Sequence, residues 1–107
     1  MPVYQKLVRD SIPDIIQRDG KTCRTRILDE QEYRMALEAK FVEEWDEYRK
    51  AGNASGRLEE LADVLEVMLG LLEVDGGTPE QLERQRQAKA AERGAFRRRV
   101  LLIDADD

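Results

Sequence analysis

The residues best suited to chemistry in this chain are two pairs of carboxylates separated by a short polar break. Glu44 and Glu47 form the first pair, and Glu60 and Asp63 form the second. Side chains three residues apart are neighbours on a helix, so each pair could act as a two-armed ligand. Oxygen donors without nitrogen or sulfur partners select a hard cation such as Mg²⁺ or Mn²⁺. The spacing therefore predicts a divalent metal site with four acidic ligands.

Both acidic pairs lie at the apolar faces of their segments. At about 100° per residue, Glu44 falls within one apolar stripe and Glu60 within another, with Glu47 and Asp63 at the borders. The stripes consist of Tyr33, Leu37, Phe41, Tyr48 and Ala51 in the first segment, and Val64, Val67 and Leu71 in the second. Burying an unpaired carboxylate costs several kcal/mol. Lys40 and scattered arginines offer too little positive charge for four acids, whereas a divalent cation would balance them.

The alternative is that these carboxylates are simply solvated. Glutamate is a good helix former, 38% of the residues are charged, and acidic runs usually lie on wet helix faces. Glu59, Glu66 and Glu73, spaced seven apart, are expected on such a face. The placement of Glu44 and Glu60 within apolar stripes favours the metal site.

Composition excludes several classes of function. The 107 residues predict one domain spanning 1–107, and a net charge of −5 argues against a broad nucleic-acid-binding surface. The chain has no histidine, which excludes Ser-His and Cys-His catalysis and histidine-ligated zinc. Cys23 is the only cysteine, so no disulfide forms within the chain, as is typical of a reducing cytoplasm. Without a signal peptide or membrane span, we expect a soluble, cytoplasmic protein.

Helix start and stop signals predict a mainly α-helical bundle of about four helices. A capping box at Ser11–Asp14 opens a short helix that Gly20 ends, and a second box at Asp29–Glu32 opens a long helix to about Lys50. A third helix is expected at about 57–74 and a fourth from Pro79 to about Arg93, capped by Thr78 and ended by Gly94. The segments near 22–27 and 96–103 could add a short two-stranded β element.

The glycine-containing break at residues 51–56 favours antiparallel pairing of the second and third helices. Because both acidic pairs stand at comparable distances from this turn, we expect all four acids to meet. The third helix is apolar around most of its circumference, and the other helices offer too little surface to cover it. We therefore expect a homodimer or homotetramer.

Other charged residues could complete a phosphate-processing site. Glu43 is the candidate for orienting or deprotonating an attacking water, with plain solvent exposure as its alternative. Lys6 and Arg9 precede the first helix, and Lys89 and Arg93 share one face of the last. These four cations are candidate phosphate ligands, although such residues are also common on ordinary surfaces.

Taken together, these residues match a known pattern. Glu43-Glu44-x-x-Glu47, twelve residues and then Glu60-x-x-Asp63 resembles the motif of the MazG-like, all-alpha nucleoside triphosphate pyrophosphohydrolases. The flanks resemble the small members described as phosphoribosyl-ATP pyrophosphohydrolase-like, and the likeness covers nearly the whole chain. The flanking motifs are Tyr4-x-Lys6-Leu7-Val8-Arg9-Asp10-x-Ile12-Pro13, Glu59-Glu60-Leu61-Ala62-Asp63-Val64-Leu65-Glu66-Val67 and Lys89-x-x-x-Arg93-Gly94-x-Phe96.

The resemblance implies a helical, usually oligomeric protein that binds Mg²⁺ and cleaves a nucleoside triphosphate into a monophosphate and pyrophosphate. It assigns metal binding to Glu44, Glu47, Glu60 and Asp63, and phosphate binding to Lys89 and Arg93, with a similar role for Lys6 and Arg9. Two substrates remain open: non-standard nucleotides removed by pool housecleaning, and phosphoribosyl-ATP of histidine biosynthesis. The rival hypotheses are a non-catalytic helical dimerisation or interaction module, and a catalytically dead relative that serves as a partner-binding subunit.

Overall fold

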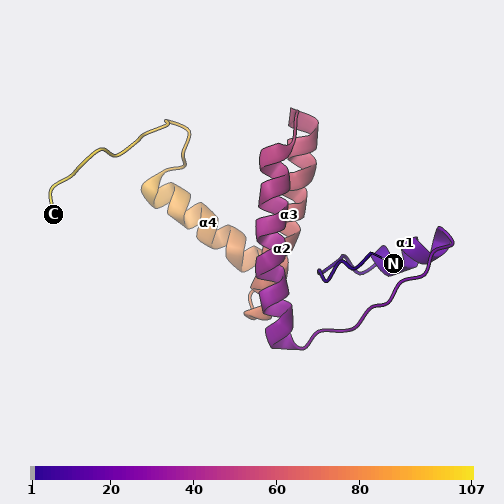
Figure 1. Cartoon of the computed structure of the whole chain (residues 1–107). Coiled ribbons are helices and arrows are strands. Elements are labelled where there is room, and N and C mark those ends of the chain that lie inside the picture. Colours follow the sequence, from indigo (N-terminus) through magenta and orange to yellow (C-terminus); the bar gives the residue numbers. More distant parts are fainter. Residues whose placement is uncertain (1) are drawn as a thin grey trace. The chain divides into compact units, whose positions relative to one another are not determined.

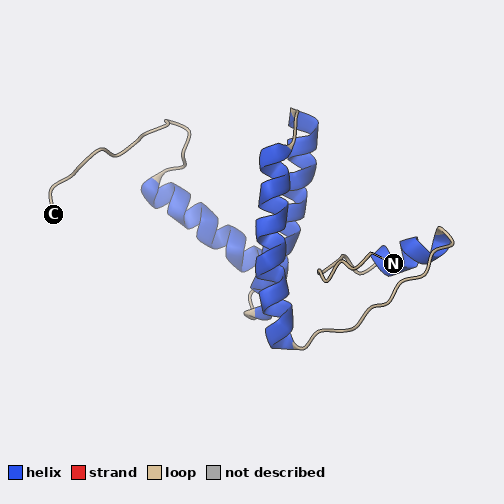
Figure 2. Ribbon diagram, in the orientation of Figure 1, coloured by secondary structure: helices blue, strands red, loops and turns tan. Residues whose placement is uncertain are grey.

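A computed structural model describes residues 2–107, and all regular secondary structure in that range is helical (Figure 2). The helices are α1 (Ile12–Arg18), α2 (Glu30–Lys50), α3 (Ala54–Val74) and α4 (Pro79–Arg93), as labelled in Figure 1. The predicted mainly α fold with about four helices is confirmed. The sequence predicts one domain, and the contacts divide the chain into two compact units, one ending at Gly76 and one spanning Gly77–Asp107.

The predicted two-stranded β element is absent from residues 2–107. The segments 22–27 and 96–103 contain no strand, and their apolar side chains are largely exposed, with Ile27 at 94% and Phe96 at 98%. An isolated two-stranded ribbon is marginal in water unless one face packs against something else. The β-branched content of these segments was therefore insufficient to form strands.

The helix starts of α2 and α4 follow the predicted capping chemistry. At α2, the Glu32 backbone N–H donates to the Asp29 carboxylate at 2.8 Å, and the Asp29 N–H donates to the Glu32 side chain at 3.2 Å. At α4, Thr78 and Gln81 form the same reciprocal pair, and Gly94 ends the helix with a φ of +85°. These bonds satisfy backbone donors that a helix terminus leaves unpaired.

The predicted capping bond at α1 and the predicted start of α3 were wrong. The Ser11 side chain makes no capping hydrogen bond, because its backbone is already helical (φ −89°, ψ −3°) and not extended as a capping residue requires. The third helix begins at Ala54, three residues earlier than expected, because the Asn53 side chain accepts from the Gly56 N–H at 2.7 Å. The break between α2 and α3 is therefore only Ala51–Asn53.

Helices α2 and α3 pack side by side as an antiparallel pair (Figure 1). Leu37 of α2 is 4% exposed and lies against Gly70 of α3, where an added Cβ would be 3.0 Å from a Leu37 methyl carbon. Within residues 2–107, the buried hydrophobic side chains are Leu37, Val64 and Val67. This core is small because two helices alone cannot enclose the apolar surface of α3.

None of the helices within residues 2–107 combines the length and the apolar character that crossing a lipid bilayer requires.

Candidate metal centre

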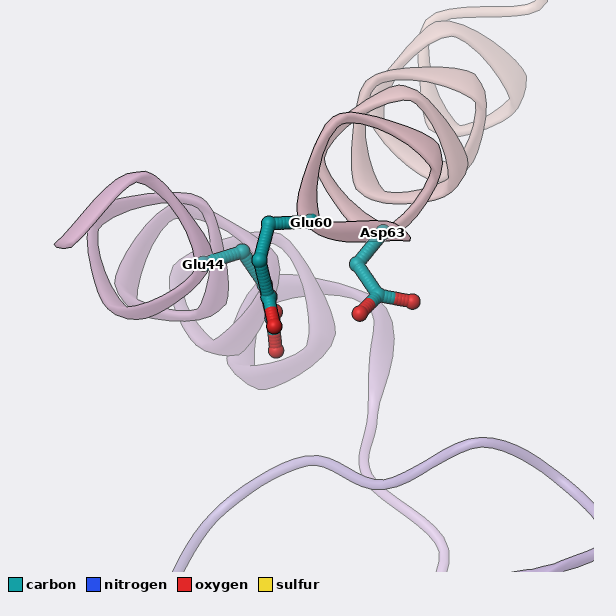
Figure 3. A group of neighbouring side chains, drawn as sticks. All are labelled: Glu44, Glu60 and Asp63. Carbon is teal, nitrogen blue, oxygen red and sulfur yellow. The ribbon is translucent and has the colours of Figure 1, made fainter. Parts of the chain in front are cut away.

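Three carboxylates of the first unit converge where α2 faces α3. Glu44 comes from α2, and Glu60 and Asp63 come from α3; one oxygen of each lies within 4.8 Å of the others. Figure 3 shows the three side chains projecting from the two helices toward the same side. Glu44 stands six residues before the end of α2 and Glu60 six residues after the start of α3, so antiparallel pairing puts them at one level.

The prediction that all four acids meet was wrong for Glu47, which is exposed and lies outside this group. Glu47 is three residues nearer the turn than Glu44, whereas Asp63 is three residues farther from it than Glu60. At 1.5 Å per residue, the two border acids are displaced in opposite directions along the helix pair. The antiparallel turn therefore selects three acids, although the charge of Glu47 still contributes to the field at Glu60.

The apolar stripes around the acids are confirmed. Glu44 is 9% exposed and is buried with Leu37, while Val64 and Val67 are buried next to Glu60. Within residues 2–107, the buried Glu44 carboxylate pairs with the Lys40 ammonium, whose Nζ lies 3.3 Å from Oε1. Lys40 was predicted as a source of positive charge for the acids, and its position four residues before Glu44 places the two side chains together on one helix.

Crowding of negative charge affects Glu60 most clearly. Burial raises the pKa of the Glu60 carboxyl, and the neighbouring charge of Asp63, a hydrogen bond with Glu44 and the charges of Glu44 and Glu47 raise that pKa further. Like charges held this close favour either a bound proton or a bound cation. Three carboxylates with no nitrogen or sulfur donor among them fit a hard divalent cation that keeps its other positions for water or phosphate.

The basic residues Lys6 and Arg9, before α1, lie beside the acids, and their role as phosphate ligands stays a prediction. The Arg9 guanidinium donates from Nη2 to Oδ1 of Asp63 at 2.6 Å, so it contacts one of the three clustered carboxylates directly. Lys6 donates from Nζ to Oε1 of Glu43 at 3.2 Å. The structure thus brings residues 6–9 to the same edge of the helix pair as the acidic cluster.

Glu43 is partly buried and held by two lysines. Burial alone would raise the pKa of the Glu43 carboxyl, but the hydrogen bond from Lys6 and the charges of Lys40 and Lys6 outweigh burial and lower it. Lys40 also lies 3.5 Å from the same oxygen that Lys6 contacts. In this state Glu43 is a weaker base than a free carboxylate, because its proton affinity is reduced and one oxygen is occupied.

Lys89 and Arg93 are exposed and lie one turn apart on α4, as their spacing predicts. They belong to the second unit, Gly77–Asp107. Their role as phosphate ligands stays a prediction.

Comparison with known proteins adds one relative of this chain. A protein of Mycolicibacterium smegmatis, described as uncharacterized, is 44% identical over 54 residues, which cover 50% of this chain and 55% of the mycobacterial protein. The chain thus matches about half the length of that relative. No family model and no solved structure matches the chain.

Proposed function

We propose that this chain is a Mg²⁺-dependent nucleoside triphosphate pyrophosphohydrolase that cleaves between the α and β phosphates. The observation that carries the proposal is the convergence of Glu44, Glu60 and Asp63, with Arg9 hydrogen-bonded to that cluster. Carboxylates bind a hard metal cation, and arginine or lysine side chains bind phosphate oxygens. A site with both groups side by side suits a metal-bound polyphosphate. The sequence resemblance to MazG-like enzymes supports the same activity.

Each residue has a defined task in this proposal. Glu44, Glu60 and Asp63 would hold Mg²⁺ from two helices, and Glu47 stays a predicted additional ligand. A bound divalent ion would neutralise phosphate charge and lower the pKa of the attacking water. Arg9 and Lys6, which lie beside the acids, bind phosphate oxygens. Once Lys6 turns to phosphate, Glu43 loses a hydrogen bond that lowers its pKa, and it can then accept the proton of the attacking water.

Housecleaning of non-standard nucleotides is the physiological role that we favour. Phosphoribosyl-ATP hydrolysis in histidine biosynthesis is the alternative substrate within the same chemistry. Either reaction belongs to the cytoplasm, the compartment that the single Cys23 already favours.

The direct test is a screen of standard and modified triphosphates, and phosphoribosyl-ATP, with pyrophosphate release as the readout. We expect release from at least one substrate with Mg²⁺ present and none after chelation. Release of orthophosphate instead would place the cleavage at another bond. Failure to hydrolyse every substrate, together with identical melting curves with and without Mg²⁺, would favour the non-catalytic interaction module, since a bound ligand must stabilise the folded state.

Self-association is a further part of the proposal. Leu58, Leu61, Leu65 and Met68 follow the alternating three-four spacing of a coiled-coil seam along α3, and they are 70%, 45%, 51% and 39% exposed. A stripe of this kind is self-complementary when two copies pack through a two-fold axis. A second copy of the chain is therefore the proposed cover, giving a homodimer or, by repetition, a homotetramer.

We expect the wild-type chain to sediment as a dimer or larger species at micromolar concentration. The double variant Leu61→Glu and Leu65→Glu should sediment as a monomer, because charges on both helices would face each other in the seam. Glu66→Gln, on the exposed face of the same helix, is the matched control and should leave the assembly unchanged. A wild-type chain that is already monomeric would contradict the proposal.

A further inference from the structure

The Arg9–Asp63 pair joins the segment before α1 to the acidic cluster. The guanidinium Nη2 is 2.6 Å from Oδ1 of Asp63, and the two side chains are 58% and 37% exposed. The neighbouring Lys6–Glu43 pair, at 3.2 Å, is also open to solvent. A cation entering from solvent can therefore reach the carboxylate that Arg9 already occupies.

Little else fixes this segment in place. Residues 2–10 form no helix or strand, and α1, which follows them, has no buried residue. Exposed ion pairs contribute little free energy because both partners are well hydrated when apart. Breaking the Arg9–Asp63 ion pair therefore costs little free energy, whereas a divalent cation would interact with Glu44, Glu60 and Asp63 at once.

We propose that Arg9 is a displaceable counter-ion of the acidic cluster, which competes with the divalent metal for the Asp63 carboxylate. This inference rests on the proposed metal centre and adds an order of events to it. Arg9 balances Asp63 in the metal-free protein and leaves Asp63 when the ion binds. The freed guanidinium is then available for the phosphates of an incoming nucleotide. Because the competition is reciprocal, anything that holds Arg9 away from Asp63 strengthens metal binding.

The test measures Mg²⁺ affinity by titration calorimetry, without nucleotide, for the wild type, Arg9→Gln and Arg18→Gln. Arg18 is an exposed arginine of α1 and serves as the control for loss of one positive charge from the same segment. Arg9→Gln should bind Mg²⁺ about two- to fivefold more tightly, the range set by the free energy of an exposed ion pair. Arg18→Gln should match the wild type.

A second measurement separates displacement from mere long-range repulsion. In the wild type, the NMR signal of the Arg9 Nε–H group should shift on adding Mg²⁺, with the same half-saturation as the calorimetric curve. In Asp63→Asn, the signal should already be near its metal-loaded position. The inference is overturned if the wild type and Arg9→Gln bind Mg²⁺ with equal affinity, or if the two arginine substitutions change that affinity equally. It is also overturned if the NMR signal of Arg9 does not shift on adding Mg²⁺. Absence of Mg²⁺ binding in all three proteins would instead remove the metal centre itself.

Discussion

Replacing Glu60 with glutamine is expected to stabilise the metal-free protein and to abolish its response to Mg²⁺. Glutamine keeps the size and a hydrogen-bonding oxygen but removes one of the negative charges that crowd Asp63 and Glu44. The variant should melt at a higher temperature than the wild type in chelator at neutral pH. Its rate of pyrophosphate release should fall by at least about 100-fold. Replacing a residue that only hydrogen-bonds to a metal ligand already lowers activity by up to about 100-fold, and Glu60 is proposed as a ligand itself.

The stabilisation should also depend on pH in a defined direction. The pKa of Glu60 is raised in the folded state, so the folded protein binds this proton more tightly than the unfolded chain. The resulting stability is fully present below the ordinary carboxyl pKa and is lost as pH rises through the raised value. Glu60→Gln has no carboxyl group to ionise at this position, so it avoids that loss of stability. The difference in melting temperature between the variant and the wild type should therefore be small in acid and grow toward neutral pH.

Glu59→Gln is the matched control because Glu59 is exposed and adjacent to Glu60 in the chain. It should retain both the Mg²⁺-dependent shift in melting temperature and the activity. Glu47→Gln should fall between the two, since Glu47 lies outside the three-acid group but contributes charge at Glu60. A Glu60→Gln protein that still gains stability from Mg²⁺ would remove Glu60 from the metal site.

Leu37→Ala is expected to cause the largest loss of stability among single substitutions in the helix pair. Leu37 is 4% exposed and belongs to a core of only three buried hydrophobic side chains within residues 2–107. Removing it leaves a cavity against Gly70 and should lower the free energy of unfolding by about 2–5 kcal/mol, as measured by urea denaturation. Ile27→Ala, at a side chain 94% exposed, should change that free energy by less than about 0.5 kcal/mol.

A double-mutant cycle with Gly70→Ala tests the contact itself. In the wild type, the new methyl group would lie 3.0 Å from one Leu37 methyl carbon and 3.4 Å from the other, which offsets the better helix propensity of alanine. In the Leu37→Ala background this contact is gone, so Gly70→Ala should be more favourable there than in the wild type. Equal effects in both backgrounds would show that the helices do not pack through this pair.

Capping chemistry was predictable from the sequence where it depends on adjacent residues alone. Asp29 and Glu32 formed the expected reciprocal bonds, and Thr78 capped α4 as expected, because each cap needs only one turn of helix. The sequence at Ser11 also predicted a capping bond, but the bond did not form because the Ser11 backbone is helical and not extended. The segment 22–27 failed for a different reason, since a strand needs a partner that no local pattern specifies.

The candidate site shows the same division. The periodicity of each helix determined that Glu44 and Glu60 lie within apolar stripes, because the positions of side chains around a helix follow from its 3.6-residue repeat. Which acids meet was decided by the antiparallel turn, which places Glu44 and Glu60 at one level and displaces Glu47 away from Asp63. The pairing of Arg9 with Asp63 likewise required the tertiary structure, because 54 residues separate them and no repeat relates their positions.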